Sequence, residues 1–320
     1  MSYRGANVLV TGGAGFIGSN LVDTLLEMGA NVTVLDNFTT GKVENIENAK
    51  RHPNFSLIRG DIRDMETIDS ATRGKHVVFH EAALVSVPKS VEDPVLNNSI
   101  NIHGTLNVFL ASIRNKVQRV VYASSAAVYG NNPTVPKKEN MEREYESPYA
   151  LSKGVDEDYA NLFNRKRDPT SPTTFVGLRY FNVYGPRQDP KSPYSGVISI
   201  FLDRITNGTP ITIFGKGDQT RDFVFVRDVV QANILAGLIP FNPASKSPYV
   251  FNVGTGKSKS LMELVRDIEY VTGKRANIAF NPPRAGDVKD SLASIRKIKT
   301  ATGYTPRFTL AQGLQITFGR

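Results

Sequence analysis

The stretch VLVTGGAGFIGSNL, residues 8–21, places three glycines between an apolar run and an amphipathic segment. Gly12, Gly15 and Gly18 follow a β-branched run that predicts a strand at 7–11, and they open a segment that predicts a helix. Glycines at this spacing let the backbone turn tightly and approach a pyrophosphate at the positive end of the helix. The stretch therefore predicts a dinucleotide-binding loop.

An acidic residue closes the second predicted strand. Asp36 ends the run NVTVLD and lies 18 residues past Gly18. A carboxylate there accepts hydrogen bonds from both ribose hydroxyls and repels a 2′-phosphate, which predicts NAD rather than NADP. Asp61, in RGDIRD, ends the third predicted strand, and two interpretations stay open for it: contact with the adenine, or an ordinary loop aspartate.

Short apolar runs alternate with longer amphipathic segments through the first half of the chain. The expected strands are 7–11, 31–35, 55–58, 76–80, 119–124 and 173–180. The expected helices include 15–28, 95–116 and 148–166. Strict alternation predicts an α/β fold, a Rossmann-type doubly wound parallel sheet with helices on both faces.

The regular pattern breaks after residue 180, where proline and glycine accumulate. We expect a dinucleotide-binding domain at 1–180 and a smaller, loop-rich C-terminal substrate region at 181–320. Two β-rich runs, 222–226 and 249–253, flank a helical stretch and are expected to return to the main sheet.

Composition excludes several classes of protein. The chain carries 39 Lys+Arg against 30 Asp+Glu, a net charge of +9, but its basic residues are scattered and show no nucleic-acid-binding signature. No apolar run is long enough to span a membrane, and zero cysteines exclude disulfides and thiolate chemistry. We expect a cytoplasmic protein that binds neither nucleic acid nor membrane. The 4 histidines show no metal-ligand spacing, so no metal is expected.

A second stretch, SPYALSKGVDEDYA at 147–160, sets a phenol beside an ammonium. Ser147 is typical of a helix N-cap and Pro148 of a first helical residue, which places Tyr149 and Lys153 one turn apart on the same face. A free phenol has a pKa of about 10, so a phenol that acts as a base near neutrality needs a nearby positive charge. Alone the pair could equally be ordinary packing, because such pairs are common on helices.

The glycine spacing together with Y-x-x-x-K resembles the extended short-chain dehydrogenase/reductases. Further segments agree and keep the family's order: HEAA (80–83), NNSINIHGTLNV (97–108), YASSAAVYG (122–130), LRYFNVYGPRQ (178–188), TRDFVFVRDV (220–229) and PPRAGDVKDS (282–291). The resemblance spans nearly the whole chain, and within the group it is most similar to UDP-hexose 4-epimerases.

The resemblance implies three catalytic residues. Tyr149 would be the acid–base, Lys153 would favour its phenolate and bind the nicotinamide ribose, and Ser125 would hydrogen-bond the 4-oxygen of the sugar. Ser124, its neighbour, is expected to be structural. The implied NAD-binding residues are Gly12, Gly15, Phe16, Ile17, Gly18, Asp36, Asn37, Asp61, Ile62, Ala82, Ala83, Asn101, Tyr149, Lys153 and Tyr180.

Missing carboxylates distinguish the implied activity from related ones. Nucleotide-sugar 4,6-dehydratases carry acidic residues where this chain has Ala126 and Ala127, and UDP-glucuronate decarboxylases carry a glutamate at the position of Ala127. Without them, a 4-keto sugar made by hydride transfer can only be reduced again. We therefore expect a UDP-sugar 4-epimerase that regenerates NAD in each cycle and keeps it tightly bound.

The resemblance also implies a site for the UDP-sugar. Arg221 and Arg284 would hold the pyrophosphate, because planar guanidinium groups match phosphate oxygens. Asp287 would bind the uridine ribose and Phe214 would pack on the uracil. The remaining implied substrate contacts are Ser86, Val87, Ser125, Tyr149, Asn182, Val197 and Ser291.

Ser291 stands where the family has a residue that limits the size of the sugar. A tyrosine there accompanies plain hexoses, and a small residue accompanies acceptance of an N-acetyl group. The expected substrates are UDP-GlcNAc and UDP-GalNAc, and UDP-glucose and UDP-galactose stay possible.

Two other functions remain open. A UDP-hexuronic acid 4-epimerase would use a basic residue such as Lys89 or Arg187 for the sugar carboxylate, although surface solvation explains both residues as well. A non-catalytic NAD(H)-sensing module would share the fold, but it has no need of Ser125, Tyr149 and Lys153 together. In this family the helices near 95–116 and 148–166 pair across a two-fold axis, so a homodimer is expected.

Overall fold

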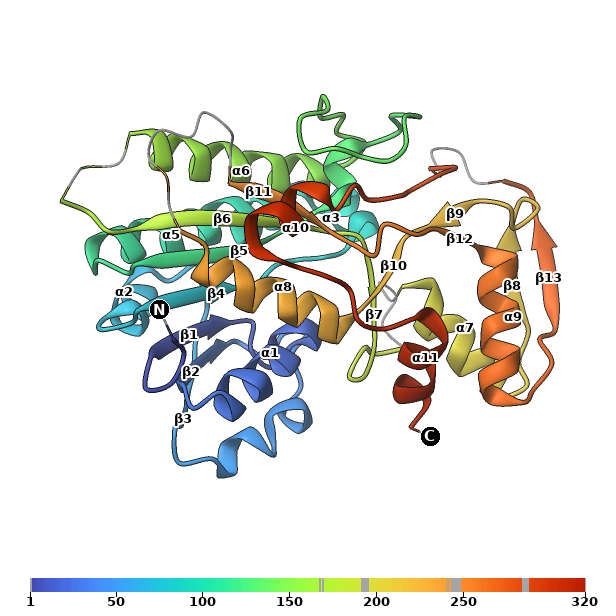
Figure 1. Cartoon of the computed structure of the whole chain (residues 1–320), viewed down its shortest axis with the longest axis horizontal. Helices are drawn as coiled ribbons and strands as arrows, with labels where there is room; N and C mark the ends of the chain where they lie inside the picture. The colour runs from blue at the N-terminus through green and yellow to red at the C-terminus, as the bar shows by residue number, and fades with distance from the viewer. Residues whose placement is uncertain are drawn as a thin grey trace.

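The computed structural model of the chain describes residues 2–166, 168, 170–190, 196–240, 242, 249–283 and 288–319. A large sheet with helices on both faces forms one region, and a smaller region of short strands and helices lies beside it (Figure 1). Within the described residues, no helix is both long and apolar enough to cross a membrane.

Seven parallel strands form the central sheet, in the order β3-β2-β1-β4-β5-β6-β11. They are β1 (Asn7–Thr11), β2 (Asn31–Asp36), β3 (Phe55–Arg59), β4 (Val77–His80), β5 (Arg119–Ser125), β6 (Thr174–Tyr180) and β11 (Val250–Val253). The predicted Rossmann-type fold is confirmed. The strand order reverses between β1 and β4, and this is where open α/β sheets bind their ligands.

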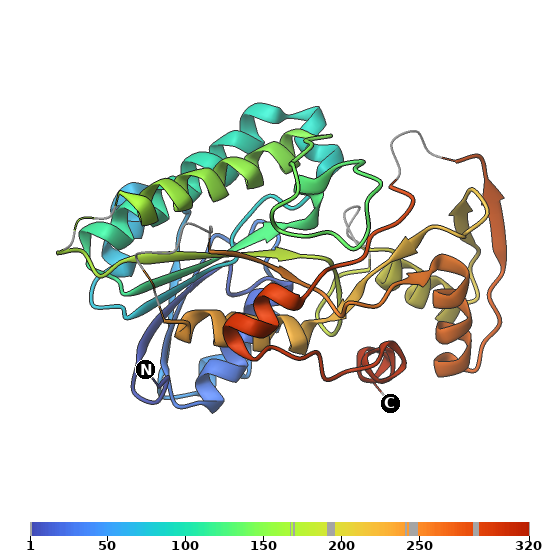
Figure 2. The same ribbon diagram turned by 45° about the horizontal axis from the view of Figure 1, so that its top comes forward.

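Helices cover both faces of the sheet (Figure 2). α1 (Phe16–Glu27) and α8 (Val226–Leu238) lie on one face, and α2 (Met65–Thr72), α5 (Thr105–Arg114) and α6 (Pro148–Arg165) lie on the other. Successive residues of a strand point to opposite faces, so Val8 and Val10 enter one apolar core while Leu9 enters the other.

The helix predicted at 95–116 is divided into three parts. α4 (Pro94–Asn97) is capped by Asp93, a π-helical turn η3 follows at Asn98–Gly104, and α5 continues from there. A Cβ on Gly104 would lie 2.6 Å from the Ile62 side chain, so the wide turn brings bare backbone against the segment after β3. π-helical turns within helices are often found at functional sites.

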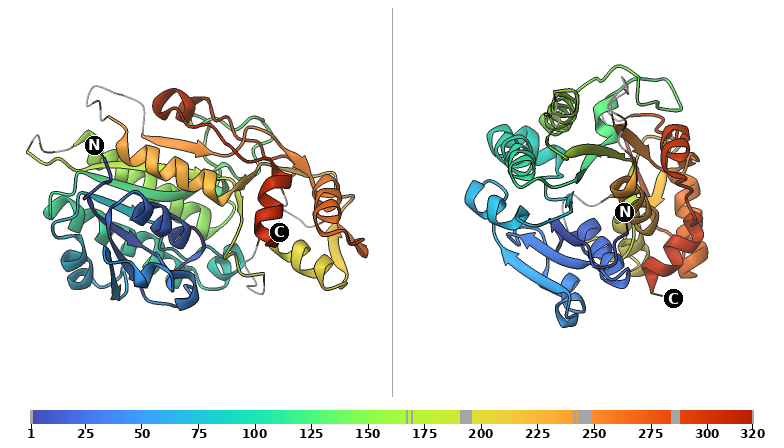
Figure 3. Two further views of the ribbon diagram at one scale, coloured as in Figure 1. Left: turned by 60° about the horizontal axis from the view of Figure 1, so that its bottom comes forward. Right: turned by 60° about the vertical axis from the view of Figure 1, so that its left-hand side comes forward.

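The smaller region has its own apolar core. β8 (Ile211–Phe214) pairs in parallel with β13 (Ile278–Asn281), and α7 (Val197–Thr206), α9 (Leu261–Thr272) and α11 (Leu310–Phe318) pack around that core. α11 contacts α9 and also β10 (Phe223–Phe225), and it carries the C-terminus where the two regions meet (Figure 3).

The expected return to the main sheet is confirmed for 249–253 and wrong for 222–226. β11 pairs with β6, whereas β10 forms a separate two-stranded sheet with β7 (Asn182–Tyr184). β6 already has β5 and β11 as neighbours, so β10 can pair only with the continuation of that chain past residue 181.

Short elements complete the chain. They are η1 (Val43–Ile46), η2 (Ala49–Arg51), α3 (Val87–Glu92), η4 (Ala126–Tyr129), β9 (Thr220–Arg221), β12 (Lys259–Ser260) and α10 (Arg296–Thr302). Asp222, between β9 and β10, joins several of these segments. Its buried carboxylate accepts hydrogen bonds from the backbone N–H groups of Thr255 (2.8 Å), Gly256 (3.0 Å) and Ala293 (3.1 Å).

Candidate active site

The predicted site residues gather at the carboxyl edge of the sheet. Because all seven strands run in parallel, the residues that end β1, β2, β4, β5 and β6 lie along one edge. These are Thr11, Asp36, His80, Ser125 and Tyr180. The edge collects the glycine loop, the predicted ribose-binding carboxylate and two of the predicted sugar- and nicotinamide-side residues.

The glycine loop is shaped by a close approach of two backbones. Gly12 has φ +68, and a Cβ on it would lie 2.7 Å from the backbone nitrogen of Ala82. A Cβ on Gly15 would lie 3.1 Å from the Gly12 carbonyl oxygen, and Gly15 is the N-cap of α1 without a side chain of its own. The helix therefore presents bare N–H groups to the edge, which fits a pyrophosphate. Phe16 and Ile17 open α1 and pack against the apolar core.

Asp36 is fixed in place by the loops around it. One carboxylate oxygen accepts from the Ala14 N–H (2.9 Å) and the other from the Phe38 N–H (2.8 Å). Burial raises the pKa of this carboxyl, and the two N–H donors oppose the rise. A carboxylate held at the end of β2 beside the glycine loop fits the adenosine ribose of NAD.

The Asp61 carboxylate is held by the side chains of two nearby residues. Its two oxygens face the guanidinium of Arg63 (3.0 and 2.8 Å), and the Asn37 amide donates to it at 2.9 Å. These donors, led by Arg63, hold the pKa of Asp61 well below its usual range. The geometry agrees with the ordinary loop aspartate, and contact with the adenine stays a prediction. Ile62 is buried under Gly104.

The first two turns of α6 position the phenol and the ammonium. The Ser147 hydroxyl accepts from the Ala150 N–H at 3.1 Å, and Pro148 is the first helical residue, so the predicted cap is confirmed. The Tyr149 N–H donates to the Ser90 hydroxyl at 3.1 Å, which ties this turn to α3. Tyr149 is 8% exposed and Lys153 2%, so both are nearly enclosed by protein.

The two adjacent serines of β5 have different surroundings. The Ser124 hydroxyl donates to Glu157 of α6 at 2.6 Å, and Glu157 is also paired with Arg179 of β6 at 2.6 and 2.8 Å. Ser125 caps η4, where its hydroxyl accepts from the Ala127 N–H at 3.1 Å. Ser124 is thus structural, as expected. Ser125 lies at the strand end beside η4, which packs against α6.

Tyr180 belongs to a buried polar cluster at the end of β6. Its hydroxyl donates to the Glu81 carboxylate (2.7 Å) and accepts from the Asn233 amide (2.8 Å). Burial raises the pKa of Glu81 to about 7, while the Tyr180 hydroxyl and the Lys153 ammonium oppose the rise. Glu81 is therefore a group at the predicted nicotinamide end that ionises near neutrality.

His80, at the end of β4, is an uncharged ring that joins two threonine hydroxyls. Its ring nitrogens contact the hydroxyls of Thr11 (2.7 Å) and Thr105 (3.0 Å). Burial, and then the Lys153 ammonium, lower the pKa of His80 to about 3, so the ring stays uncharged at any working pH.

The Asn101 side chain makes its hydrogen bonds with other groups of the protein. Its amide oxygen accepts from the Leu84 N–H (2.8 Å), and its nitrogen donates to the Leu84 carbonyl (3.0 Å) and to Ser152 (3.2 Å). It thereby ties the loop after β4, which contains Ala82 and Ala83, to the turn between Tyr149 and Lys153. A direct contact with NAD stays a prediction.

The predicted substrate residues come from both regions. Ser86 is buried and caps α3 by accepting from the Lys89 N–H (3.0 Å), and Val87 beside it is exposed. Asn182 is exposed at the start of β7, and Val197 opens α7. Phe214 ends β8.

Arg221, predicted to bind the pyrophosphate, and Ser291, predicted to limit the size of the sugar, lie close together at β9. Arg221 donates to the Thr220 carbonyl at 2.8 Å, and the Ser291 N–H donates to the same carbonyl at 3.1 Å. Arg221 and Ser291 are therefore brought together across Thr220. Arg284 and Asp287 lie outside the described residues.

Both basic residues proposed to bind a sugar carboxylate have acidic partners within the protein. Arg187 pairs with Asp23 of α1 at 2.5 Å, and Lys89 pairs with Glu92 at 3.0 Å. The contact with Asp23 ties Arg187 to α1, whereas the alternative predicted for this residue was solvation at the surface.

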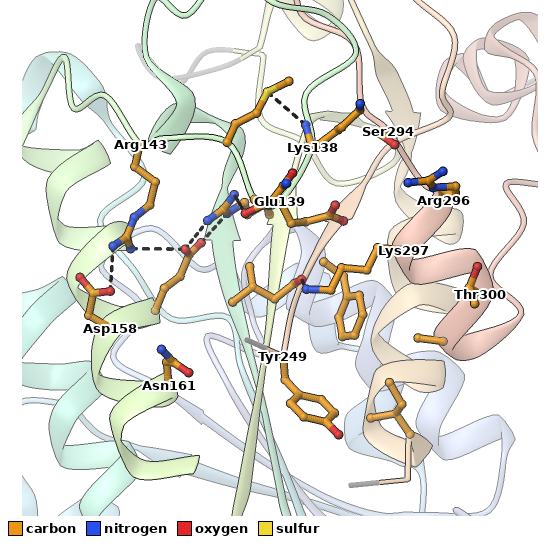
Figure 4. Close-up of a pocket in the computed structure, with 18 of the residues that line it drawn as sticks. Lys138, Glu139, Arg143, Asp158, Asn161, Tyr249, Ser294, Arg296, Lys297 and Thr300 are labelled. Carbon is orange, nitrogen blue, oxygen red and sulfur yellow. Dashed lines mark hydrogen bonds and ion pairs between the residues drawn. The ribbon is translucent and has the colours of Figure 1, made fainter. Parts of the chain in front are cut away.

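A cavity of about 940 Å³ lies along the open edge of β11, and none of the predicted site residues lines it (Figure 4). Its charged lining covers the unpaired backbone of that edge strand. Lys297 donates to the Val250 carbonyl (2.9 Å), and the Asn252 N–H donates to Glu139 (2.9 Å). Charged side chains at a sheet edge prevent pairing with other chains, which accounts for the polarity of this cavity.

Comparison with known proteins identifies the family. Residues 8–254 match the NAD dependent epimerase/dehydratase family. The chain belongs to this family. NAD is accordingly its cofactor, and the loop around Gly12 and Asp36 fits that group.

Three proteins similar to this chain are named for different UDP-sugars. A UDP-glucose 4-epimerase from Mycolicibacterium smegmatis is 39% identical over 97% of this chain and 96% of its own. The structure of a UDP-N-acetylglucosamine 4-epimerase from Methanobrevibacter ruminantium, in complex with UDP-N-acetylmuramic acid, is 39% identical, with a TM-score of 0.90 over 98% of this chain and 97% of that one. A UDP-glucuronic acid 4-epimerase from Bacillus cereus, in complex with UDP-glucuronic acid and NAD, is 30% identical, with a TM-score of 0.86 over 98% of each chain.

The polar residues behind the site were missed by sequence reasoning. Glu81 and His80 lie in HEAA, a segment interpreted only as a family motif, and Asp156 lies three residues after Lys153 on the same helical face. The i,i+3 spacing was the one signal that could have pointed to Asp156.

The close approach at the glycine loop predicts the effect of a methyl group. Gly12→Ala should purify with little or no NAD, because its Cβ would displace either the loop or the Ala82 backbone. Gly74→Ala is the matched control: Gly74 has φ +67, but a Cβ there would meet no heavy atom of the described residues within 4 Å. The control therefore carries only the backbone strain, about 1–2 kcal/mol. NAD released on denaturation, measured per chain, checks this. Equal NAD in both variants would contradict it.

Proposed function

We propose that this family member is an NAD-dependent 4-epimerase of UDP-sugars. The observation that carries the proposal is the start of α6, where Tyr149 and Lys153 lie nearly enclosed on a helix that packs against η4 and against β5, the strand that ends at Ser125. η4 follows Ser125 with Ala126 and Ala127, so this turn offers no acid for elimination or decarboxylation. The names of the relatives support the same reaction.

The proposed roles follow from the chemistry of each side chain. The chemistry that bound NAD supplies is reversible hydride exchange with C4 of the sugar. Tyr149 takes the proton of the 4-hydroxyl as the hydride leaves, and gives it back when hydride returns. Lys153 stabilises the phenolate by its positive charge, and Ser125 holds the 4-oxygen. A half-turn of the 4-keto sugar between the two transfers exposes its other face and inverts C4.

We also propose that the two regions bind different ligands. Residues 1–180, together with the returning α8 and β11, would bind NAD, and residues 181–320 would bind the UDP-sugar. Arg221, proposed to bind the pyrophosphate, and Ser291, proposed to limit the size of the sugar, both lie in the second region and hydrogen-bond to the Thr220 carbonyl. Asp222 supports this arrangement because it holds the adjoining loops by backbone hydrogen bonds.

Tyr149→Phe tests the reaction. Loss of the proton-transferring hydroxyl should lower turnover of a UDP-sugar by about 10²–10⁴-fold while NAD stays bound. Tyr159→Phe is the matched control on the same helix, because Tyr159 packs on Phe163 and should keep full turnover. Full turnover by Tyr149→Phe would overturn the proposed acid–base, and turnover by neither the parent nor the control would favour an NAD(H)-sensing module.

For the substrate we propose the UDP-GlcNAc/UDP-GalNAc pair. The support is the small Ser291 beside Arg221, together with a relative named for the acetylated sugar. UDP-glucose and UDP-galactose would also fit a site with a small residue there. The hexuronic acid alternative loses support from Arg187, whose guanidinium is paired with Asp23.

Ser291→Tyr tests the choice of sugar. The larger side chain should abolish interconversion of the acetylated pair and leave the plain pair active, whereas Ser291→Ala should keep both. Product analysis with each UDP-sugar and no added NAD measures this. Turnover of the plain pair alone by the parent protein would contradict the acetylated assignment while leaving the chemistry intact.

We propose a homodimer formed by α5 and α6. Apolar side chains stay exposed on these helices and on the turns before them, including Val95 (77%), Leu151 (43%), Leu162 (40%) and Leu110 (39%). Leu151 and Leu162 lie three turns apart on one face of α6, so they form a stripe that a second copy can cover.

Leu162→Arg should convert the dimer to a monomer, because it places a charge within this stripe. Val43→Arg is the matched control, since Val43 is 43% exposed but lies on η1, on another part of the surface. Light scattering after size-exclusion chromatography gives the mass. A parent protein that is monomeric at all concentrations, or a dimer unaffected by Leu162→Arg, would contradict the interface.

A further inference from the structure

A buried carboxyl faces the lysine of the active site. The Asp156 carboxylate lies 3.6 Å from the Lys153 ammonium, and the two side chains are 1% and 2% exposed. An enclosed ammonium is costly unless an opposite charge lies close by. Within the described residues, Asp156 is the ion-pair partner of Lys153.

The distance between the two groups suits a counter-charge rather than a hydrogen-bond partner. At 3.6 Å the oxygen lies beyond the usual hydrogen-bond distance, so the contact is chiefly an attraction between charges. The same carboxylate oxygen, Oδ2, is buried and accepts no hydrogen bond from any described residue. The arrangement places a buried negative charge beside the Lys153 ammonium.

The surroundings of Asp156 come from three other elements. Thr105 of α5 stabilises its charged form by hydrogen bonding, and His80 lies behind Thr105 as a neutral ring. Glu157 of α6 adds a like charge, and the buried phenol of Tyr122 lies nearby on β5. Lys153 is therefore the cation that faces Asp156.

We propose that Asp156 is a positioning residue for the reaction: its carboxylate is the buried counter-charge that holds the Lys153 ammonium in place one turn after Tyr149. This rests on the proposed function, because it assigns Asp156 a part in the acid–base chemistry of Tyr149. Asp156 acts through Lys153 and touches neither the sugar nor Tyr149 in this assignment.

The counter-charge has a defined pH range. Burial raises the pKa of Asp156 to about 8, and the Lys153 ammonium opposes the rise. Below that pH the carboxyl carries a proton and is neutral, and above it the carboxylate is present. Asp156 therefore supplies its negative charge on the alkaline side of this pKa.

Asp156→Asn mimics the protonated carboxyl, so its pH profile tests the proposal. We expect kcat/KM close to that of the parent at pH 6.5, where the parent carboxyl is protonated, and about tenfold lower at pH 9, where asparagine cannot supply the negative charge of the carboxylate. Asp158→Asn makes the same change two residues further along α6, on an exposed side chain paired with Arg143, and should follow the parent at both pH values. A loss that is equal at both pH values would overturn the proposal.

A second measurement is independent of turnover. In full-length protein with NAD present, urea midpoints are compared for Asp156→Asn in the parent and in a Lys153→Met background. At pH 9 the substitution should lower the midpoint more in the parent, because only there does it remove an attraction between charges, and at pH 6 this difference should vanish. A raised carboxyl pKa by itself gives stability that is present at acid pH and lost as pH rises through about 8, but this contribution is common to both backgrounds and cancels.

Each outcome either supports or overturns the proposed role of Asp156. No difference between backgrounds at pH 9, or one that persists at pH 6, overturns the counter-charge. If Asp156→Asn fails to fold at pH 9 and the double variant folds, the coupling is confirmed, whereas failure of both shows that the carboxyl is needed regardless of Lys153 and overturns the proposal. A chain inactive on every UDP-sugar but showing the coupling would overturn the proposed function and leave the ion pair standing.

Discussion

The buried ion pair between Glu157 and Arg179 determines where the active-site helix lies. Glu157 comes from α6 and Arg179 from β6, and the same carboxylate accepts from Ser124 of β5. Three elements are thus joined at one carboxylate that is 4% exposed. Breaking one partner of such a pair leaves an uncompensated charge inside the protein, so the arrangement resists sliding of the helix over the sheet. Tyr149 and Lys153 keep their place at the strand ends because the same helix is fixed two turns further on.

The parallel sheet supplies the other half of the geometry. Its strands deliver Thr11, Asp36, His80, Ser125 and Tyr180 to one edge, and the bare backbone of Gly12 closes against Ala82 there. The cofactor side is therefore built from the first region, whereas Arg221 and Ser291 stand in the second. The residues predicted to bind the cofactor and those predicted to select the sugar thus lie in separate parts of the chain.

Local patterns explain which parts of this could be predicted. The six strands of the first half, the cap at Ser147 and the glycine loop follow from periodicity and from residue types a few positions apart, because hydrogen bonds within a turn fix them. The position of β10 and the π-helical turn at Asn98–Gly104 depend on which neighbours are free in three dimensions. The contacts of Tyr180 join it to Glu81 and Asn233, 99 and 53 residues away, and no local pattern encodes such partners. The role of each site residue came from family resemblance rather than from periodicity.

The placement of carboxyls gives the site its chemical character. Glu81 and Asp156 both lie near Lys153, and burial moves their pKa values to about 7 and about 8. Both carboxyls are therefore close enough to the lysine to be affected by its charge. η4, which follows Ser125, carries Ala126 and Ala127 instead. A site that places its ionisable carboxyls on the lysine and leaves alanines beside the sugar-side serine can move a proton at one oxygen, but it has no group there to take a second proton from the sugar. Reversible oxidation at C4 is the chemistry that such an arrangement supports.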